Sequence, residues 1–369
     1  MAFPFSLQDF PMRPLFAQID LAAVRHNHAF AKRCAPGRQV FAVVKANAYG
    51  HGVREVVTAL HDEAEGFAVA SLEEGAEVRA MHDGARILLL EGCFEASEYA
   101  IAARLRIDVV VQGVEQAEAL LASSLPAPLN VWLKLDSGMH RLGFDATALR
   151  TWHPRLAGAA QVAELNLMSH FACSDERNHP LTEAQLEQFL GLLDLDFAQR
   201  SLANSAAVLT LPAAHMDWIR PGIMLYGATP FAELSAAELG LKPAMSLNAQ
   251  LIAVREVAEG ESVGYGAGWV ASRPSRIGTV SCGYADGYPR NAPAGTPVIV
   301  RGQRVPLAGR VCMDLLMIDL SELPEAGVGD AVELWGAQLP VDEIAVACGT
   351  VGYELLTKVT ARVPRRYRS

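Results

Sequence analysis

The chain has 369 residues, of which 51% are hydrophobic and 20% charged, a composition typical of a soluble enzyme with room for two domains. Its net charge of -10 argues against a broad nucleic-acid surface, and the short basic stretch at 362–368 is typical of a solvated or packed terminus. Six scattered cysteines without a Cys-x-x-Cys pair favour a reducing compartment and support neither zinc nor dithiol chemistry.

The N-terminus does not have the pattern of a secretion signal. Met1-Ala2-Phe3-Pro4-Phe5 lacks both a basic region and a long apolar region, and apolar runs such as 87–90 are far too short to cross a bilayer. We therefore predict a cytoplasmic protein.

The first two thirds of the chain alternate between short apolar runs and helical patterns. The helical patterns include 72–81, 113–122 and 182–193, the last with Thr182 as a candidate N-cap. The apolar runs lie at 40–44, 66–70, 86–90, 108–111, 129–135, 164–169, near 201 and at 218–220. This repetition favours a (β/α)8 TIM-like barrel over a doubly wound sheet, since no Gly-x-Gly-x-x-Gly follows the first strand.

After residue 240 the amino-acid composition changes. Pro, Gly and β-branched residues become frequent, and turn signals recur at 301–304 and 326–329, which predicts an antiparallel β domain. The predicted fold is thus α/β plus β, with an N-terminal barrel at 1–236 and a C-terminal antiparallel β domain at 237–369. The first stretch of about 15 residues could instead join the β domain.

A lysine ends the first apolar run, at Phe41-Ala42-Val43-Val44-Lys45. Barrels carry catalytic groups at the C-terminal ends of their strands. A lysine at that place can form a Schiff base with an aldehyde cofactor when burial and neighbouring charges favour its neutral form. The alternative is a lysine that caps the strand and points to solvent.

Eight motifs follow one another over nearly the whole chain. They are Val44-Lys45-Ala46-Asn47-Ala48-Tyr49-Gly50-His51-Gly52, Lys134-Leu135-Asp136-Ser137-Gly138-Met139-His140-Arg141-Leu142-Gly143, Ser169-His170-Phe171, Ala203-Asn204-Ser205-Ala206, Arg220-Pro221-Gly222-Ile223, Val263-Gly264-Tyr265-Gly266, Gly283-Tyr284-Ala285-Asp286-Gly287 and Gly309-Arg310-Val311-Cys312-Met313-Asp314. Together they resemble the alanine racemases, which are pyridoxal-phosphate enzymes. The resemblance implies interconversion of L-alanine and D-alanine with pyridoxal 5'-phosphate as cofactor.

Racemisation needs one group to remove the α-proton from one face and a second to return a proton to the other. The resemblance makes Lys45 both the Schiff-base lysine and the base for the D-isomer, and Tyr265 the base for the L-isomer. It assigns His170 and Arg220 to the support of the tyrosine phenolate. Arg220 also faces the pyridine nitrogen and, because arginine keeps its proton, leaves that nitrogen unprotonated. Taken singly, Arg220 also fits an ion pair with Asp217 or a glutamate, and Tyr265 fits an aromatic side chain packed at a turn.

The phosphate contacts implied by the resemblance are Ser205, the backbone N–H groups of Gly222 and Ile223, and the hydroxyls of Tyr49 and Tyr353. Glycine at position 222 would let the backbone approach an anion closely. Ser205 alone fits a helix N-cap or turn residue equally well.

Arg141 and the backbone N–H of Met313 match contacts to the substrate carboxylate. Lys134 matches a lysine that is carbamylated in a number of family members, where the modified side chain holds the arginine that corresponds to Arg141. The unmodified alternative is an ion pair of Lys134 with Asp136 or another acid.

A polar corridor to the site is implied at Asp175, Arg290 and Arg310, with Tyr284 and Tyr353 as a narrow inner gate that excludes amino acids much larger than alanine or serine. A solvated surface is the alternative for the three charged residues. The remaining histidines lack partners at ligand spacing, so no metal site is expected.

Lys45 lies in the predicted barrel and Tyr265 in the predicted β domain. In the family this is solved by a head-to-tail homodimer, in which the tyrosines and Met313 of one chain complete the site of its partner. The alternatives are a racemase that also accepts serine, a fold-related decarboxylase and a non-catalytic cofactor carrier. The sequence leaves open whether the enzyme supplies D-alanine for peptidoglycan or serves alanine catabolism.

Overall fold

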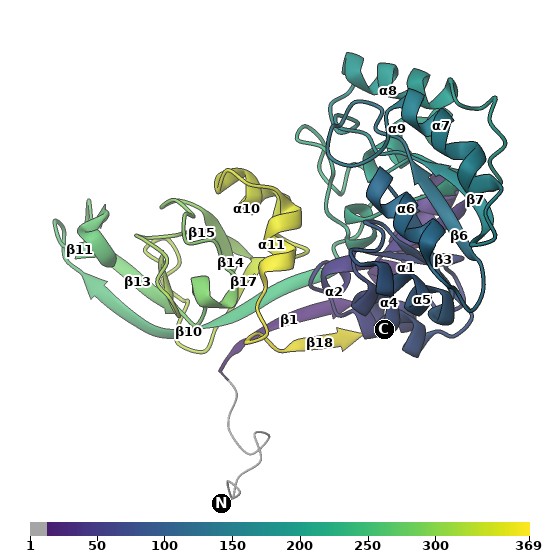
Figure 1. Ribbon diagram of the computed structural model, residues 1–369. Helices are drawn as coiled ribbons and strands as arrows, with labels where there is room; N and C mark the ends of the chain where they lie inside the picture. The colour runs from purple at the N-terminus through teal and green to yellow at the C-terminus, as the bar shows by residue number, and fades with distance from the viewer. Residues whose placement is uncertain (1–12) are drawn as a thin grey trace, which may run out of the picture. The chain divides into compact units, whose positions relative to one another are not determined.

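The computed structural model describes residues 13–369, which form two compact units. One unit is Leu21–Lys242, and the other combines the described residues up to Asp20 with Pro243–Ser369. The pentapeptide considered for a secretion signal lies outside the described residues. Figure 1 shows both units with many of their helices and strands labelled.

The first unit is a closed barrel of parallel strands, which confirms the predicted fold (Figure 1). Its strands are β2 (Gln39–Val43), β3 (Gly66–Val69), β4 (Arg86–Leu89), β5 (Ile107–Val111), β6 (Leu129–Lys134), β7 (Val162–Met168), β8 (Arg200–Ser201) and β9 (Trp218–Ile219). The sheet closes where β2 pairs with β9, Val40 opposite Ile219. Most of these strands appear in the sequence as short apolar runs because both of their faces are largely buried.

Helices connect the barrel strands. They are α1 (Leu21–Cys34), α2 (Lys45–Tyr49), α3 (Val53–Ala59), α4 (Leu72–Met81), α5 (Ala96–Leu105), α6 (Val114–Ala122), α7 (Ala146–Ala157), α8 (Pro180–Leu190) and α9 (Ser205–Thr210). The predicted N-cap of α8 is wrong. The helix begins at Pro180 and is capped by His179, whose ring accepts from the Leu181 N–H, because proline is well suited to the first helical position.

Aromatic side chains fill the inside of the barrel. The ring of Phe41 stacks on Trp218 at 3.9 Å and meets Trp132 edge-on at 5.7 Å. Arg86 lies against both indoles, and its Nε donates to the Asp108 carboxylate at 2.7 Å. The barrel is therefore a packed core, and its chemistry is confined to the ends of the strands.

The second unit is built on a largely antiparallel sheet, as predicted (Figure 1). Its strands are β1 (Leu15–Asp20), β10 (Met245–Val257), β13 (Ser275–Val280), β14 (Pro297–Val300), β15 (Gln303–Pro306), β16 (Leu316–Asp319), β17 (Ala331–Trp335) and β18 (Arg365–Arg368), with a separate pair of β11 (Ser262–Val263) and β12 (Trp269–Val270). β1 pairs antiparallel with β10, and the Asp20 N–H donates to the Ala244 carbonyl oxygen at 2.8 Å. β1 and β18 form a parallel pair, which the sequence did not suggest.

Two helices in the second unit, α10 (Val341–Ala347) and α11 (Gly352–Lys358), were not anticipated for a β domain. Between residues 13 and 369, no helix combines the length and apolar character that a bilayer crossing requires. The same residues contain no group of His, Cys, Asp and Glu side chains that could hold a metal ion.

Candidate active site

Lys45 follows β2 and Val44 at the C-terminal end of the barrel, where catalytic groups of this fold gather. It is partly buried, and its charge contributes to the lowered pKa values of Lys134 and His170. The side chain therefore belongs to a cluster of charged groups, which argues against a lysine that simply points to bulk solvent.

A left-handed turn comes directly after this lysine. The φ angles at residues 46–49 lie between 52° and 54°, although none of the four is glycine. A left-handed conformation costs about 1–2 kcal/mol for each such residue. Contacts from elsewhere in the barrel must therefore hold the turn in place.

Glu74 in the first turn of α4 supplies one of these contacts. Its Oε1 accepts from the Ala46 N–H at 2.7 Å, and its Oε2 accepts from the Ala70 N–H at 2.9 Å. The sequence reasoning missed this residue. The available signal was the spacing of Ser71 and Glu74, which is typical of a helix start and marks a glutamate that binds backbone N–H groups.

Cations gather around the end of β6. Burial and the nearby charge of Arg220 lower the pKa of Lys134 to about 8. Arg141 and Lys45 act in the same direction, and Glu91 opposes them. The site thus holds an excess of positive charge.

Lys134 does not form the ion pair with Asp136 that was its unmodified alternative. Asp136 accepts instead from the N–H groups of Gly138 and His140, both at 3.0 Å, and lies 3.1 Å from the His140 ring. In the described part of the chain no carboxylate lies within ion-pair distance of Lys134. No ion pair with a carboxylate of residues 13–369 therefore holds the buried Lys134 amine in its charged form.

Arg220 is buried directly after β9. Its Nη1 donates to Ser201 Oγ at 2.5 Å, and its Nη2 donates to the Ser169 carbonyl oxygen at 2.6 Å. Burial lowers its pKa to about 10, so it stays charged at neutral pH. Asp217 accepts instead from the Arg200 N–H, so the ion pair of Arg220 with Asp217 is absent.

His170 lies beside this guanidinium. The distance from Arg220 Nη2 to His170 Nδ1 is 3.4 Å. Burial, and then the charge of Arg220, holds the pKa of His170 well below its ordinary value, so the ring is neutral. Because arginine only donates, Nδ1 is the acceptor and Nε2 carries the hydrogen.

A small cradle lies at the ends of β8 and β9. Ser205 Oγ accepts from the Gly222 N–H at 2.9 Å, and a Cβ placed on Gly222 would lie 2.6 Å from the Tyr49 hydroxyl. Ile223 is buried, and its N–H has no acceptor among residues 13–369. Burial raises the pKa of Tyr49 to about 12, which keeps its hydroxyl a donor.

The cradle corrects one expectation and changes another. Ser205 is not the N-cap of α9, because Asn204 caps this helix by accepting from the Ala207 N–H at 3.1 Å. The Gly222 N–H, expected to face an anion, donates to Ser205 instead. The Ser205 hydroxyl and the Ile223 N–H are donors that can serve an anion here, and the Tyr49 hydroxyl lies beside them.

In the second unit, Tyr265 lies in a glycine-rich turn between β11 and β12 and is 70% exposed. Gly264 has a φ of 75°, and a Cβ placed there would lie 2.8 Å from Met317 Cε. A Cβ on Gly266 would lie 3.2 Å from a guanidinium nitrogen of Arg310. Arg310 therefore packs against the turn that carries Tyr265. The Tyr265 ring itself is exposed, so it is not an aromatic side chain packed at a turn, which was the alternative.

Tyr284 and Met313 lie in neighbouring segments of this unit. The Tyr284 N–H donates to the Cys312 carbonyl oxygen at 3.0 Å, and the Ala285 N–H donates to the Met313 carbonyl oxygen at 2.9 Å. The side chain of Met313 is 53% exposed. Its own N–H donates to no acceptor in the described residues, so it is available to a carboxylate.

The remaining predicted residues are exposed. Tyr353 lies in α11 and is 37% exposed, and Asp175 and Arg290 are exposed. For Asp175 and Arg290, exposure is compatible with both a corridor and a solvated surface. The barrel unit thus carries the lysines, the arginines, His170 and the cradle at the ends of its strands, while the second unit presents Tyr265, Tyr284 and Met313.

Two family models match the chain: the alanine racemase N-terminal domain over residues 19–230 and the alanine racemase C-terminal domain over residues 244–367. The chain belongs to the alanine racemase family. Membership makes it an enzyme of the isomerase class. Because the models of both alanine racemase domains match, neither the decarboxylase nor the non-catalytic cofactor carrier is supported.

Relatives agree over nearly the full length. The biosynthetic alanine racemase of Pseudomonas aeruginosa is 78% identical, over 96% of this chain and 99% of that protein. The catabolic alanine racemase of Pseudomonas putida is 49% identical, over 96% and 99%. The crystal structure of the Pseudomonas aeruginosa enzyme matches with a TM-score of 0.96 over 97% of this chain and 100% of that chain, and alanine racemase from Acinetobacter baumannii, 38% identical, matches with 0.92 over 97% and 100%.

Proposed function

We propose that the chain interconverts L-alanine and D-alanine with pyridoxal 5'-phosphate as cofactor. In this proposal Lys45 and Tyr265 of the partner subunit exchange the α-proton on opposite faces of the substrate. Family membership supports the reaction, and the residues of the barrel support the mechanism.

The observation that carries the proposal is the excess of cations beside Lys45. Burial is the main cause of the lowered pKa of Lys134, the charges of Arg220, Arg141 and Lys45 lower it further, and among the charged neighbours only Glu91 opposes them. Buried charge of one sign requires a partner of the other sign. A substrate carboxylate and a phosphate-bearing cofactor supply that sign.

The residues at the barrel end fit pyridoxal phosphate. The cradle of Ser205, Tyr49 and Ile223 offers hydroxyl and N–H donors to a phosphate group. The amine of Lys45 suits the aldehyde. When bound, pyridoxal phosphate supplies an electron sink that stabilises negative charge at the α-carbon.

Arg220 and His170 set the protonation of the site. Arg220, with a pKa of about 10, keeps its proton at neutral pH and so acts as a hydrogen-bond donor toward a ring nitrogen without transferring a proton to it. His170 accepts from Arg220 at Nδ1, so its Nε2–H is free to donate to a phenolate. A neutral donor placed there would favour the charged form of a tyrosine.

In the proposed mechanism each of the two bases removes the α-proton from one enantiomer. Lys45 takes the α-proton from the D-isomer on one face, and Tyr265 of the partner subunit takes it from the L-isomer on the other. Arg141 and the free Met313 N–H of the partner subunit hold the substrate carboxylate, so that both enantiomers present the same carbon between the bases.

A head-to-tail homodimer is part of the proposal. Tyr265 and Met313 are large apolar side chains that are 70% and 53% exposed on the second unit. Arg310 packs against the Tyr265 turn, and Tyr284 is hydrogen-bonded to the segment that carries Met313. One continuous surface therefore presents these side chains, and covering it with the barrel of a second copy would complete two equivalent sites.

We further propose that Lys134 is carbamylated. Carbon dioxide reacts with the neutral amine, and with a pKa of about 8 roughly a tenth of the Lys134 amine is neutral at pH 7. The amine nitrogen bonds to the carbon of carbon dioxide and releases one proton to solvent, and the resulting N-carboxylate anion would offset the positive charge of neighbours such as Arg141.

At fixed dissolved carbon dioxide, carbamate at Lys134 should increase as the pH rises from 6 to 8, because the fraction of neutral amine rises through a pKa of about 8. Carbon-13 NMR with labelled bicarbonate would detect it. The Lys134→Ala variant should lose the signal, while Lys358→Ala, which removes an exposed lysine, should keep it. A signal that is absent at pH 8, or that persists in Lys134→Ala, would contradict the assignment.

The proposed reaction is tested by hydrogen exchange in deuterium oxide. The purified holoenzyme should show the visible absorbance of bound pyridoxal phosphate, and it should introduce deuterium at the α-carbon of both L-alanine and D-alanine while converting each into the other. Exchange or conversion of only one enantiomer would reject the racemase mechanism.

The relatives also bear on the biological role. The biosynthetic enzyme is 78% identical to this chain and the catabolic enzyme 49%. We therefore propose that this chain supplies D-alanine for peptidoglycan.

A further inference from the structure

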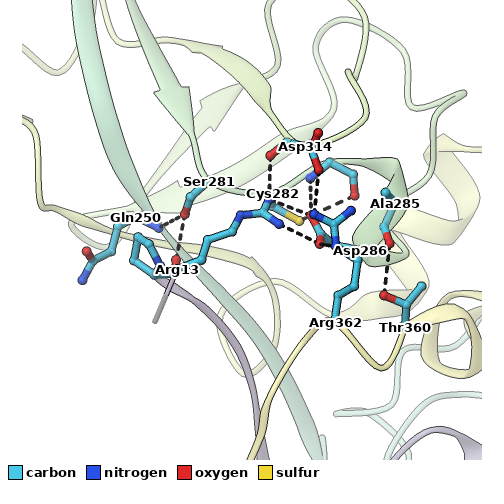
Figure 2. Close-up of polar contacts among 11 residues, drawn as sticks. Arg13, Gln250, Ser281, Cys282, Ala285, Asp286, Asp314, Thr360 and Arg362 are labelled. Carbon is cyan, nitrogen blue, oxygen red and sulfur yellow. Dashed lines mark hydrogen bonds and ion pairs between the residues drawn. The ribbon is translucent and has the colours of Figure 1, made fainter. Parts of the chain in front are cut away.

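The carboxylate of Asp286 is fully buried in the second unit and is held by two arginines (Figure 2). Arg13 donates to both of its oxygens, each at 2.8 Å, and Arg362 Nε lies 3.6 Å from Oδ1. A buried carboxylate held from two sides in this way has a fixed position. Neither the predicted site nor the predicted mechanism used this residue.

Asp286 first fixes its own turn. Its Oδ2 accepts from the Gly283 N–H at 2.9 Å, at the start of the one-turn helix Tyr284–Asp286. This contact closes the turn around Tyr284. The direction of the Tyr284 backbone therefore depends on the carboxylate.

The same arginines also hold the segment that carries Met313 (Figure 2). Arg13 Nη2 donates to the Asp314 carbonyl oxygen at 2.6 Å, and Arg362 Nη2 donates to the Asp314 carboxylate at 2.7 Å. A Cβ placed on Gly283 would lie 2.4 Å from the Met313 carbonyl oxygen. The backbones of Gly283 and Met313 are thus in direct contact. The residues on either side of Met313 are both hydrogen-bonded, which fixes the direction of its free N–H.

The segment that follows α11, the helix that carries Tyr353, also contacts the turn of Asp286. The Thr360 N–H donates to the Asp286 carbonyl oxygen and its hydroxyl donates to the Ala285 carbonyl oxygen, both at 3.0 Å. A Cβ placed on Gly287 would lie 2.3 Å from the Lys358 carbonyl oxygen. Asp286 therefore lies where the segments of Tyr284, Met313 and Tyr353 meet.

We propose that Asp286, clamped by Arg13 and Arg362, is a positioning residue for the active site of the partner subunit. It touches neither substrate nor cofactor and acts through the Met313 N–H and the Tyr284 turn. The inference rests on the proposed function, in which these groups close the neighbouring site. Its consequence is that loss of the carboxylate weakens the hold on the substrate carboxylate in the partner's site.

A hybrid dimer can show on which side the effect falls. When a Lys45→Ala chain pairs with a Tyr265→Phe chain, the one working site combines Lys45 of the second chain with Tyr265 and Met313 of the first. Asp286→Asn on the Lys45→Ala chain then changes the segments that close the working site. On the Tyr265→Phe chain, the same substitution changes only the segments that close the dead site.

In the first arrangement we expect the KM for alanine to rise ~10-fold with a smaller change in kcat, and in the second we expect both constants to stay within about twofold. The matched control is Asp194→Asn on the Lys45→Ala chain. It removes an exposed carboxylate that Arg150 holds at 2.7 and 2.8 Å in the barrel unit, and it should leave the constants unchanged.

Equal effects in both arrangements would show that Asp286 only stabilises the fold, and no effect in either would show that it positions nothing. Both results overturn the inference. The proposal of a shared site would still stand, because the hybrid without a substitution at Asp286 would be active. An inactive unmodified hybrid of confirmed composition would overturn the shared site and the inference with it. If Asp286→Asn does not fold, Arg13→Lys decides, since lysine cannot donate to both carboxylate oxygens in the same way, and it should raise the KM roughly threefold with the same dependence on the chain.

Discussion

Lys45→Ala is expected to lower kcat for both enantiomers by at least ~10⁴-fold, because the amine serves both as the covalent attachment of the cofactor and as one of two bases. The substitution should leave the free energy of unfolding within about 0.5 kcal/mol, since the side chain is partly exposed. Steady-state rates in both directions and urea denaturation would measure the two effects. Lys358→Ala, which removes an exposed lysine, should retain full activity.

Activity should return when Lys45→Ala chains are mixed with Tyr265→Phe chains under conditions of subunit exchange. Each variant alone lacks one base at both sites, but half of the mixed dimers are hybrids with one intact site, so recovery should approach roughly a quarter of the wild-type rate. Mixing Lys45→Ala with the Lys45→Ala, Tyr265→Phe double variant gives no intact site and should restore nothing. If hybrids are present but inactive, the two bases do not come from different subunits.

Gly222→Ala is expected to weaken the binding of pyridoxal phosphate roughly 10- to 100-fold. The added Cβ would lie 2.6 Å from the Tyr49 hydroxyl and 3.3 Å from its Cζ. Tyr49 cannot retreat easily, because its ring is buried and stacked on Tyr226 at 4.9 Å. The cradle must therefore open. Titration of the apoenzyme with the cofactor, followed by absorbance, would give the affinity.

Gly327→Ala is the matched control for this substitution. A Cβ on Gly327 meets no atom within 4 Å, so the same change of residue type carries no steric cost there. Normal cofactor affinity in both variants would mean that the Tyr49 hydroxyl and Gly222 do not form an anion cradle. Equal losses in both would point to a general effect on the fold.

Local pattern was enough to predict the barrel. Most of the parallel strands are buried on both faces, so runs such as 40–44 and 109–111 are continuously apolar. The pairing of β1 with β18 had no such signal. Gln18 lies opposite Arg366 in a parallel register, and such a pairing of distant segments leaves no trace in either segment alone.

In the candidate active site, too, the residues in local motifs were predicted and those that act through contacts between distant segments were not. Motifs located Lys45, Arg220 and Tyr265, because these residues stand at strand ends or in glycine-rich turns. Glu74 and Asp286 were missed because their importance lies in tertiary hydrogen bonds to backbone groups of other segments. The left-handed turn at residues 46–49 was also invisible, since Ala-Asn-Ala-Tyr contains no glycine to suggest it.

The hydrogen bond from Asp20 to Ala244 has a consequence for biosynthesis. The ribosome makes β1 first and β10 only after the whole of Leu21–Lys242. Until then β1 has no antiparallel neighbour, and a flexible loop of that length would carry a large closure entropy. A barrel that folds before β10 is available brings the two strand ends together, so a released chain that ends at residue 242 should hold a protease-resistant barrel and an unpaired β1.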